Sequence, residues 1–185
     1  MASQGPWRFQ RALILGGARS GKSRFAEQLA ETLPAPRLYL ATAEAGDAEM
    51  AARIAHHQAR RGDAWHTREE PLELAACIRA AQGRYGVILV DCLTLWLGNL
   101  LGQGFDSREV EEAGRELAGV VAASATPLIL VSNEVGWGIV PDNPLARLFR
   151  DQAGRLHQRL ANVVDLVVMV MAGLPMVLKS SGAKE

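Results

Sequence analysis

Short runs of consecutive apolar residues recur along the chain, and longer amphipathic segments separate most of them. Uninterrupted apolar runs of about four to eight residues are typical of strands buried on both faces, whereas apolar positions three and four apart indicate helices. On this basis we predict strands at about 12–15, 38–41, 87–90, 127–131 and 164–171, with a sixth at 174–179. We predict helices over about 22–32, 46–61, 71–81, 93–101, 106–123 and 143–161.

The predicted strands and helices alternate along the chain. Such alternation is typical of an α/β fold, in which helices cover both faces of a mostly parallel sheet. The sequence contains no internal repeat or low-complexity tract that would divide it. We therefore expect one domain over 12–179, preceded by an N-terminal extension at 1–11 and followed by a C-terminal tail at 180–185.

Composition narrows the class of protein. The 185 residues are 49% hydrophobic and 22% charged, the balance of a soluble globular protein. Lys plus Arg equals Asp plus Glu at 20 each, so the chain lacks the basic excess that broad nucleic-acid binding requires. Cys77 and Cys92 have no metal-ligand spacing, and no apolar run reaches the roughly 18 residues of a membrane span. We therefore expect a cytoplasmic protein.

Lysine is rare in this chain. Lys22 is the only lysine in the first 178 residues, against a background of arginine. An isolated lysine of this kind indicates chemistry that arginine cannot supply. It lies in the segment Gly16–Ser23, which matches the pattern G-x-x-x-x-G-K-S/T and stands between a predicted strand and a predicted helix. The sequence therefore predicts a P-loop NTPase fold of the RecA-like kind.

Each part of this segment has a role in holding phosphate. Its glycines let backbone N–H groups point inward, and the helix N-terminus adds the positive end of its dipole. Lys22 would contact the β- and γ-phosphates, and the Ser23 hydroxyl would bind Mg²⁺. A second, acidic ligand is expected at the end of another strand, and Asp91 closes the apolar run 87–90. We therefore predict a nucleotide–Mg²⁺ site with Ser23 and Asp91 as metal ligands.

A histidine doublet stands in a basic stretch of a predicted helix. At helical spacing His56 and His57 point about 100° apart, so they cannot reach the same atom. Packing on a helix face would explain His57, and a solvated basic stripe would explain His56. The functional alternative is a histidine nucleophile that attacks phosphorus while basic neighbours hold the phosphates. The residues alone leave both interpretations open, whereas His66 and His157 are expected to be ordinary surface or half-buried side chains.

Several segments match a known family in order along the chain. They are GGARSGKSRFAE at 16–27, YLATAEAGDAEMAARIAHHQARR at 39–61, ILVDCLT at 88–94 and LVSNEVGWGIVPDNPLARLFRDQAGRLHQRLA at 130–161. With these segments the chain resembles the bifunctional adenosylcobinamide kinase/adenosylcobinamide-phosphate guanylyltransferase family of cobalamin biosynthesis. The resemblance covers most of residues 12–178, and its most specific parts are NEVGWGIVP and the histidine doublet.

The resemblance implies two activities. The first phosphorylates the aminopropanol hydroxyl of adenosylcobinamide with ATP or GTP. The second transfers GMP from GTP to that phosphate, which releases pyrophosphate and forms adenosylcobinamide-GDP. In the family the transfer passes through a covalent GMP–histidine intermediate, and the matching position is His57. The resemblance also suggests a homotrimer. The charge balance and the apolar runs lead us to expect no nucleic-acid partner and no membrane span.

The candidate catalytic residues are therefore His57 and Lys22. The candidate nucleotide-binding residues are Gly16, Gly17, Ala18, Arg19, Ser20, Gly21, Lys22, Ser23, Ala41, Thr42, Ala43, Gln58, Ala59, Arg60, Arg61, Glu69 and Asp91. The chain departs from the common family pattern at Ala43, where members often carry serine, and at Asp91, where they often carry glutamate.

The loop 133–141 would lie at the carboxyl edge of the sheet, where ligands of open parallel sheets bind. Asn133, Glu134 and Trp137 either shape the corrinoid or nucleotide pocket or form a structural loop with Trp137 as a packing anchor.

Two other functions of the whole protein stay open at this point. One is a simple P-loop small-molecule kinase with structural histidines, and the other is a nucleotide-binding regulatory module.

Overall fold

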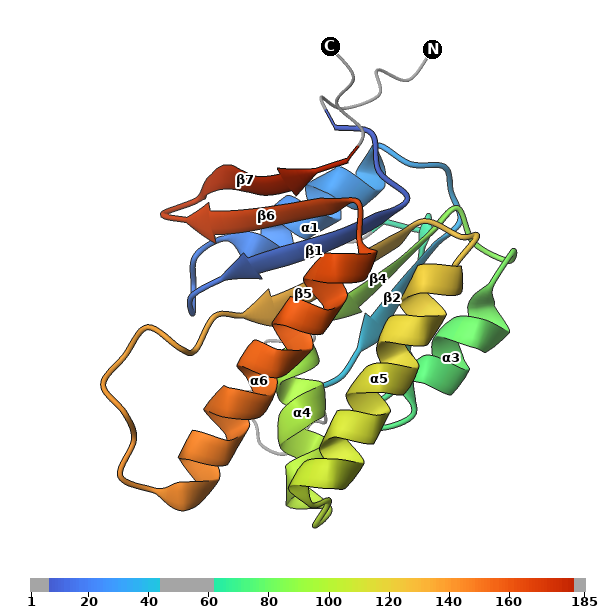
Figure 1. Ribbon diagram of the computed structural model, residues 1–185. Helices are drawn as coiled ribbons and strands as arrows, with labels where there is room; N and C mark the ends of the chain where they lie inside the picture. Colours follow the sequence, from blue (N-terminus) through green and yellow to red (C-terminus); the bar gives the residue numbers. More distant parts are fainter. Residues whose placement is uncertain (1–6, 44–61, 182–185) are drawn as a thin grey trace.

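A seven-stranded sheet organises the part of the chain that the computed structural model describes, residues 7–43 and 62–181 (Figure 1). The strands are β1 (Arg11–Gly16), β2 (Arg37–Ala41), β3 (Trp65–Glu69), β4 (Val87–Asp91), β5 (Leu128–Asn133), β6 (Leu166–Met171) and β7 (Leu174–Ser180). Their order is β3-β2-β4-β5-β1-β6-β7, and every neighbouring pair is parallel except β6 and β7. The predicted mostly parallel sheet is therefore confirmed.

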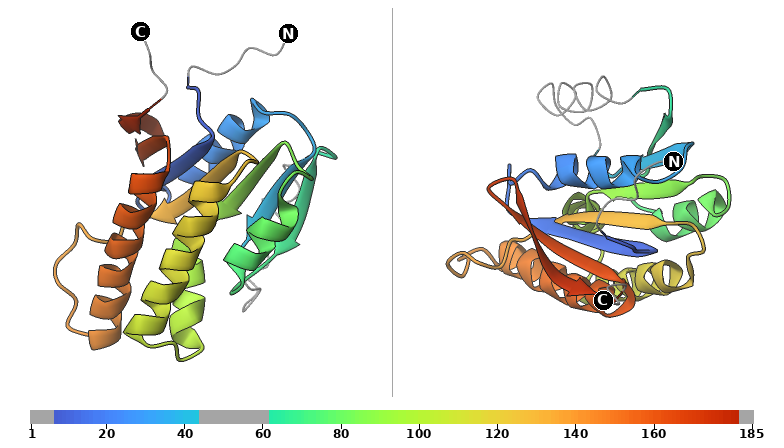
Figure 2. Two further views of the ribbon diagram at one scale, coloured as in Figure 1. Left: turned by 45° about the vertical axis from the view of Figure 1, so that its right-hand side comes forward. Right: turned by 90° about the horizontal axis from the view of Figure 1, so that it is seen from above.

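Helices cover both faces of this sheet (Figure 2). They are α1 (Lys22–Glu31), α3 (Leu74–Ala81), α4 (Leu93–Gly102), α5 (Ser107–Ala123) and α6 (Pro144–Val163). Alternate strand residues point to opposite faces, so Leu13 and Leu15 of β1 pack with α3 to α6, while Ala12 and Ile14 pack with α1. Burial on both faces explains why the central strands read as uninterrupted apolar runs.

Strand β3 is absent from the pattern-based prediction. Its sequence, WHTRE, has no apolar run because it is an edge strand with mostly exposed side chains, and within ranges 7–43 and 62–181 it pairs, in parallel, only with β2. Trp65 supplies its main apolar contact, with its ring 6.3 Å from that of Tyr39. The helix expected from Pro71 begins instead at Leu74, so that start was wrong. The carbonyls of Pro71 and Leu72 accept hydrogen bonds from side chains of α4.

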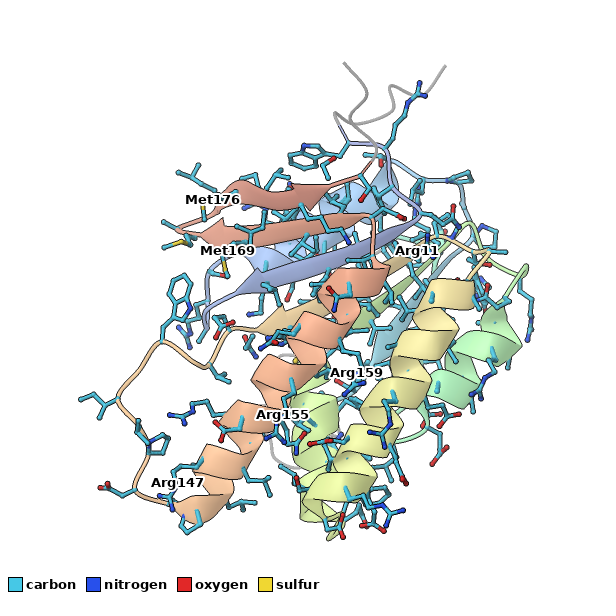
Figure 3. The ribbon with its side chains drawn as sticks, in the orientation of Figure 1. Arg11, Arg147, Arg155, Arg159, Met169 and Met176 are labelled. Carbon is cyan, nitrogen blue, oxygen red and sulfur yellow. The ribbon has the colours of Figure 1, made fainter. Side chains whose placement is uncertain are left out.

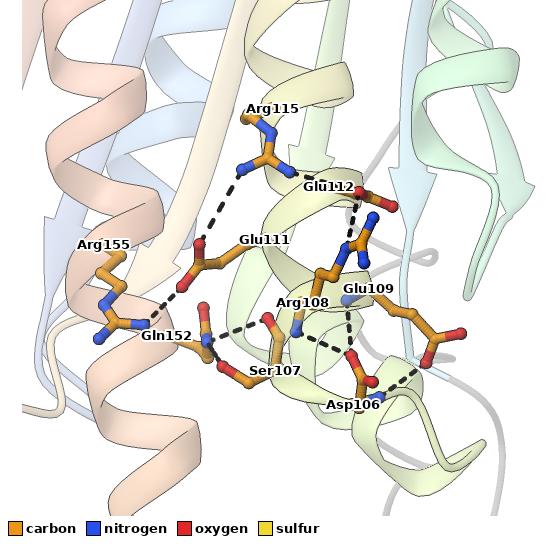
Figure 4. Close-up of polar contacts among 9 residues, drawn as sticks. All are labelled: Asp106, Ser107, Arg108, Glu109, Glu111, Glu112, Arg115, Gln152 and Arg155. Atoms are coloured by element: carbon orange, nitrogen blue, oxygen red, sulfur yellow. Dashed lines mark hydrogen bonds and ion pairs between the residues drawn. The ribbon is translucent and has the colours of Figure 1, made fainter.

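The two longest helices, α5 and α6, begin at caps that the sequence encodes. The Asp106 carboxylate accepts hydrogen bonds from two backbone N–H groups of α5, while Glu109 accepts the N–H of Asp106 (Figure 4). This capping box is predicted from the sequence, because Asp106 is followed three positions later by Glu109. Arg155 of α6 pairs with Glu111 of α5 and joins the two helices side by side.

The described part of the N-terminal segment packs on the domain. The Trp7 ring lies 5.4 Å from the ring of Phe25 on α1. Arg11, labelled in Figure 3, opens β1 one residue before the expected start. Its guanidinium pairs with Asp165 at 3.1 Å. In the ranges 7–43 and 62–181, no helix has the length and apolarity to cross a membrane.

Candidate functional site

The carboxyl ends of four parallel strands meet at one edge of the sheet (Figure 1). The phosphate loop 16–21 follows β1, and residues 41–43 close β2. Asp91 closes β4 in register with Ala41, and Asn133 closes β5 in register with Gly16. The structure therefore brings the described candidates of the sequence to the same edge, where open α/β sheets bind ligands.

The backbone of the phosphate loop has the features that anion binding needs. Arg19 and Gly21 take positive φ values of 55° and 95°, and left-handed residues of this kind turn N–H groups toward one concave side. At Gly16 a β-carbon would lie 2.5 Å from Ser20 Oγ and 2.6 Å from the Val170 carbonyl oxygen. Only glycine is accommodated at that position without movement of its neighbours.

Two side chains of this loop are arranged to receive a phosphate. Lys22 opens α1 and is buried, and its Nζ donates to the Gly17 carbonyl at 3.2 Å. The ammonium is thereby held over the loop. Ser20 Oγ is buried and has no hydrogen-bond partner within the described residues. A buried hydroxyl without a partner is costly, and a phosphate oxygen in the loop would satisfy it.

The donor set near the loop fits Mg²⁺. Ser23 lies half-buried in the first turn of α1, and this helix packs across β4, whose last residue is Asp91. Asp91 is also half-buried, and its Oδ2 accepts a hydrogen bond from the Tyr39 hydroxyl at 3.0 Å, which orients the carboxylate. Mg²⁺ is held by one or two protein oxygens together with waters and phosphate oxygens. A hydroxyl and a carboxylate beside a phosphate loop meet that requirement.

The nucleotide-binding candidates at the ends of β2 and β3 are Ala41, Thr42, Ala43 and Glu69. Thr42 is fully buried, and its hydroxyl donates to the Cys92 carbonyl at 2.7 Å and accepts the Cys92 N–H at 2.8 Å. These bonds tie the end of β2 to the end of β4, so the hydroxyl proton is already used within the protein. Ala43 is half-buried, and Glu69 is exposed at the end of β3, in register with Ala41.

Cys92 follows Asp91 at the centre of this edge. Its thiol is buried, with Sγ 3.2 Å from the Thr94 hydroxyl. Burial raises the pKa of the Cys92 thiol, and the Asp91 carboxylate raises it further. A protonated thiol is a poor nucleophile, so Cys92 is a structural residue here.

The predicted nucleophile falls outside the described residues. His57, together with Gln58, Ala59, Arg60 and Arg61, belongs to the segment 44–61, as does the whole predicted helix 46–61. Their roles stay predictions.

A polar cluster behind β5 was missed by the sequence reasoning. His157 of α6 is buried rather than superficial, and its Nε2 lies 2.7 Å from the hydroxyl of fully buried Ser132. Its Nδ1 lies 3.7 Å from Glu134 Oε2. Burial lowers the pKa of His157, although the nearby Glu134 carboxylate opposes this effect. The available signal was helical spacing, since 153, 156, 157 and 160 form the buried stripe of α6.

The loop after Glu134 is open to solvent. The side chains of Trp137 and Ile139 are 71% and 97% exposed, so Trp137 does not anchor the loop to the described part of the chain. The interpretation of Trp137 as an internal packing anchor is therefore wrong.

Comparison with protein families gives a match over most of the chain. A family model described as cobinamide kinase / cobinamide phosphate guanyltransferase matches residues 12–178. The bifunctional adenosylcobalamin biosynthesis protein CobP of Pseudomonas aeruginosa is 50% identical over 169 residues, which cover 91% of this chain and 97% of that protein. The protein of the same description, CobU, from Salmonella typhimurium is 43% identical over 179 residues, with 90% and 98% covered.

Solved structures share the fold at low identity. An ATPase from the type III secretion system of pathogenic bacteria superposes with a TM-score of 0.56 at 12% identity, covering 93% of this chain and 57% of that chain. The ATPase EscN of enteropathogenic E. coli gives 0.54 at 12% identity, covering 89% and 43%. Such likeness shows the fold alone, and it confirms the predicted P-loop NTPase fold.

Proposed function

Because the chain belongs to the cobinamide kinase / cobinamide phosphate guanyltransferase family, we propose that it phosphorylates the aminopropanol hydroxyl of adenosylcobinamide with ATP or GTP. It then transfers GMP from GTP to that phosphate and yields adenosylcobinamide-GDP and pyrophosphate. The observation that carries the proposal is the phosphate loop, with Lys22 held over it, in a chain that matches the family model from 12 to 178.

Phosphoryl transfer needs positioning and charge neutralisation more than covalent chemistry. The loop N–H groups and Lys22 would hold the β- and γ-phosphates. Ser23 and Asp91 would hold Mg²⁺, which neutralises phosphate charge when it is bound. The contacts proposed for the nucleotide are those at 16–23, at 41–43, at 58–61, at Glu69 and at Asp91.

Guanylyl transfer requires attack at the α-phosphorus instead. We assign this attack to His57, which would bond to phosphorus as pyrophosphate leaves and would then pass GMP to the corrinoid phosphate. Arg60 and Arg61 would hold the phosphates during both displacements. A histidine nucleophile divides the transfer into two displacements in one site.

Incubation with α-³²P-labelled GTP tests this function. We expect an acid-labile GMP adduct on the parent chain and on His56→Asn, and no adduct on His57→Asn. The His57 variant should still phosphorylate adenosylcobinamide, because the kinase step needs no covalent intermediate. Labelling of His57→Asn at the parent level would refute the assignment. Phosphorylation without any adduct on the parent would favour the simple kinase, and no turnover at all would favour the regulatory module.

We also propose that the chain acts in the cytoplasm as a homotrimer. Edge strand β7 exposes side chains of both faces, Leu174 and Met176 on one and Val177 on the other. Met176 is labelled in Figure 3. Contiguous exposed apolar side chains mark association surfaces. Sedimentation equilibrium should give the mass of three chains for the parent and a smaller mass for Met176→Lys, whereas a monomeric parent would refute the trimer.

A further inference from the structure

Strand β5 lies between the strand of the phosphate loop and the strand of Asp91. The residue that follows it, Glu134, therefore has the phosphate loop on one side and Asp91 on the other. Its backbone N–H donates to the Gly16 carbonyl at 3.0 Å. This bond fixes Glu134 to the first residue of the loop.

The carboxylate of Glu134 has a polar neighbour on each of its two oxygens. Its Oε1 accepts the Gly136 N–H at 2.7 Å, and its Oε2 lies 3.7 Å from His157 Nδ1. The Glu134 side chain is 21% exposed, so it is not sealed off from solvent. A carboxylate oxygen has two lone pairs, so each oxygen keeps capacity for a further hydrogen bond.

The protonation of His157 follows from its surroundings. Burial lowers its pKa, so the imidazole is neutral near pH 7 and carries one N–H. An ionised Glu134 only accepts hydrogen bonds, so we assign the proton to Nδ1. Nε2 then accepts from the Ser132 hydroxyl at 2.7 Å. Ser132 of β5 thus anchors the ring that faces Glu134.

The other described acids at this edge are less suited to act on a substrate hydroxyl. Glu69 lies on edge strand β3, and three strands separate it from β1. Asp91 is bound to the Tyr39 hydroxyl and is the proposed metal ligand. Glu134 is the acid of these three whose backbone N–H is hydrogen-bonded to the phosphate loop.

We propose that Glu134 accepts the proton of the adenosylcobinamide hydroxyl during phosphorylation, and that His157 is a positioning residue that fixes the Glu134 carboxylate. This inference rests on the kinase activity proposed above. The hydroxyl oxygen forms a bond to the γ-phosphorus, and the bond from that phosphorus to the bridging oxygen breaks. The bridging electron pair leaves with the nucleoside diphosphate, and the hydroxyl proton moves to Glu134, which later releases it to solvent.

The Glu134→Gln variant tests the proton acceptor, because it keeps the shape of the side chain and removes its basicity. We expect the kcat of phosphorylation to fall about 10²- to 10⁴-fold, while the KM for the nucleotide changes less than about threefold. The fold decrease in this kcat should exceed any fold decrease in GMP labelling by at least about 30-fold. Glu134→Asp, which keeps a carboxylate, should recover part of the phosphorylation rate. The matched control is Glu31→Gln, an exposed change at the far end of α1, which should leave kcat at the parent value.

Two results would overturn the inference alone, with an active parent chain. One is a kcat for Glu134→Gln within about threefold of the parent, and the other is a rise of the nucleotide KM that matches the fall of kcat. A folded parent that does not phosphorylate adenosylcobinamide would overturn the proposed function and this inference with it.

A pair of His157 variants tests the positioning role. The amide nitrogen of His157→Asn can take the place of Nδ1 and donate to Glu134, whereas that of His157→Gln takes the place of Nε2 and cannot. We expect His157→Asn to retain a kcat at least about tenfold above His157→Gln, at similar KM and similar thermal stability. Equal kcat values for the two variants would refute the positioning role, since a purely structural histidine would not distinguish them.

Discussion

Two loops at the same edge of the sheet differ in how the chain holds them. The phosphate loop 16–21 is held by its own backbone and by Lys22, and the N–H of Gly173 donates to the Ser20 carbonyl at 2.9 Å. The loop from 134 to 143 is bonded near its two ends, at Glu134 and at the cap of α6. Between these ends it exposes large apolar side chains.

The difference separates two kinds of site. A loop fixed by hydrogen bonds along its length has one shape, and a short motif therefore predicts it. A loop with exposed apolar side chains acquires its contacts from a ligand or from another chain. We therefore expect substitutions in the first loop to affect both stability and phosphate chemistry, and substitutions in the second to affect recognition.

The largest effect is expected from Lys22→Ala in the phosphate loop. It should lower the kcat of phosphorylation about 10³-fold, because it removes the cation that contacts the transferred phosphate. The free energy of unfolding should fall by about 1 kcal/mol for the lost hydrogen bond from Nζ to the Gly17 carbonyl, so the variant should stay folded. Steady-state kinetics and urea unfolding measure the two quantities. Phosphorylation at the parent rate would contradict the assigned role of the loop.

A pair of glycine substitutions compares the two loops directly. Gly16→Ala should cost about 1–3 kcal/mol of unfolding free energy, because its β-carbon would meet a backbone carbonyl at 2.6 Å. Gly138→Ala in the second loop should be nearly neutral, since no atom lies within 4 Å of its β-carbon. Equal losses in urea unfolding would show that the two loops are equally constrained.

His157, which lies against Glu134 at the start of the second loop, should make the stability of the protein depend on pH. The pKa of His157 is lowered in the folded state, so the unfolded state binds more protons below about pH 6.5. The free energy of unfolding therefore falls as pH drops below that value. Between pH 7.5 and pH 5.5 the parent should lose more of its unfolding free energy than His157→Asn, which has no imidazole to protonate. Parallel curves for the two proteins in urea unfolding would argue against a neutral buried histidine.

The smallest effect on stability is expected from Trp137→Ala. With 71% of its side chain exposed, its loss should change the unfolding free energy by less than about 0.5 kcal/mol. The matched control is Trp96→Ala, where a buried ring bonded to the Leu72 carbonyl is lost at a cost of about 3–5 kcal/mol. The KM for adenosylcobinamide should rise about threefold in the Trp137 variant alone. An unchanged KM would remove Trp137 from the corrinoid pocket.

The same contrast explains how much the sequence predicts. Continuous apolar runs identify the central strands, and the glycine–lysine motif identifies the phosphate loop, because both depend on residues adjacent in the chain. Edge strand β3 escaped detection since its pairing with β2, rather than an apolar run, makes it a strand. The contacts of His157 with Ser132 and Glu134 join residues more than 20 positions apart, which no local pattern encodes.

The position of β1 has a consequence for the order in which the protein is made. Synthesis delivers the phosphate loop early, yet both strands that flank β1 come much later, since β5 begins at Leu128 and β6 at Leu166. The N–H that supports Ser20 arrives later still, with Gly173. Domains emerge from the ribosome N-terminus first. A nascent chain therefore contains the phosphate-loop motif long before it contains the strands and the Gly173 N–H that hold the loop in place. Nucleotide can stabilise this protein only after nearly all of the described chain has been translated.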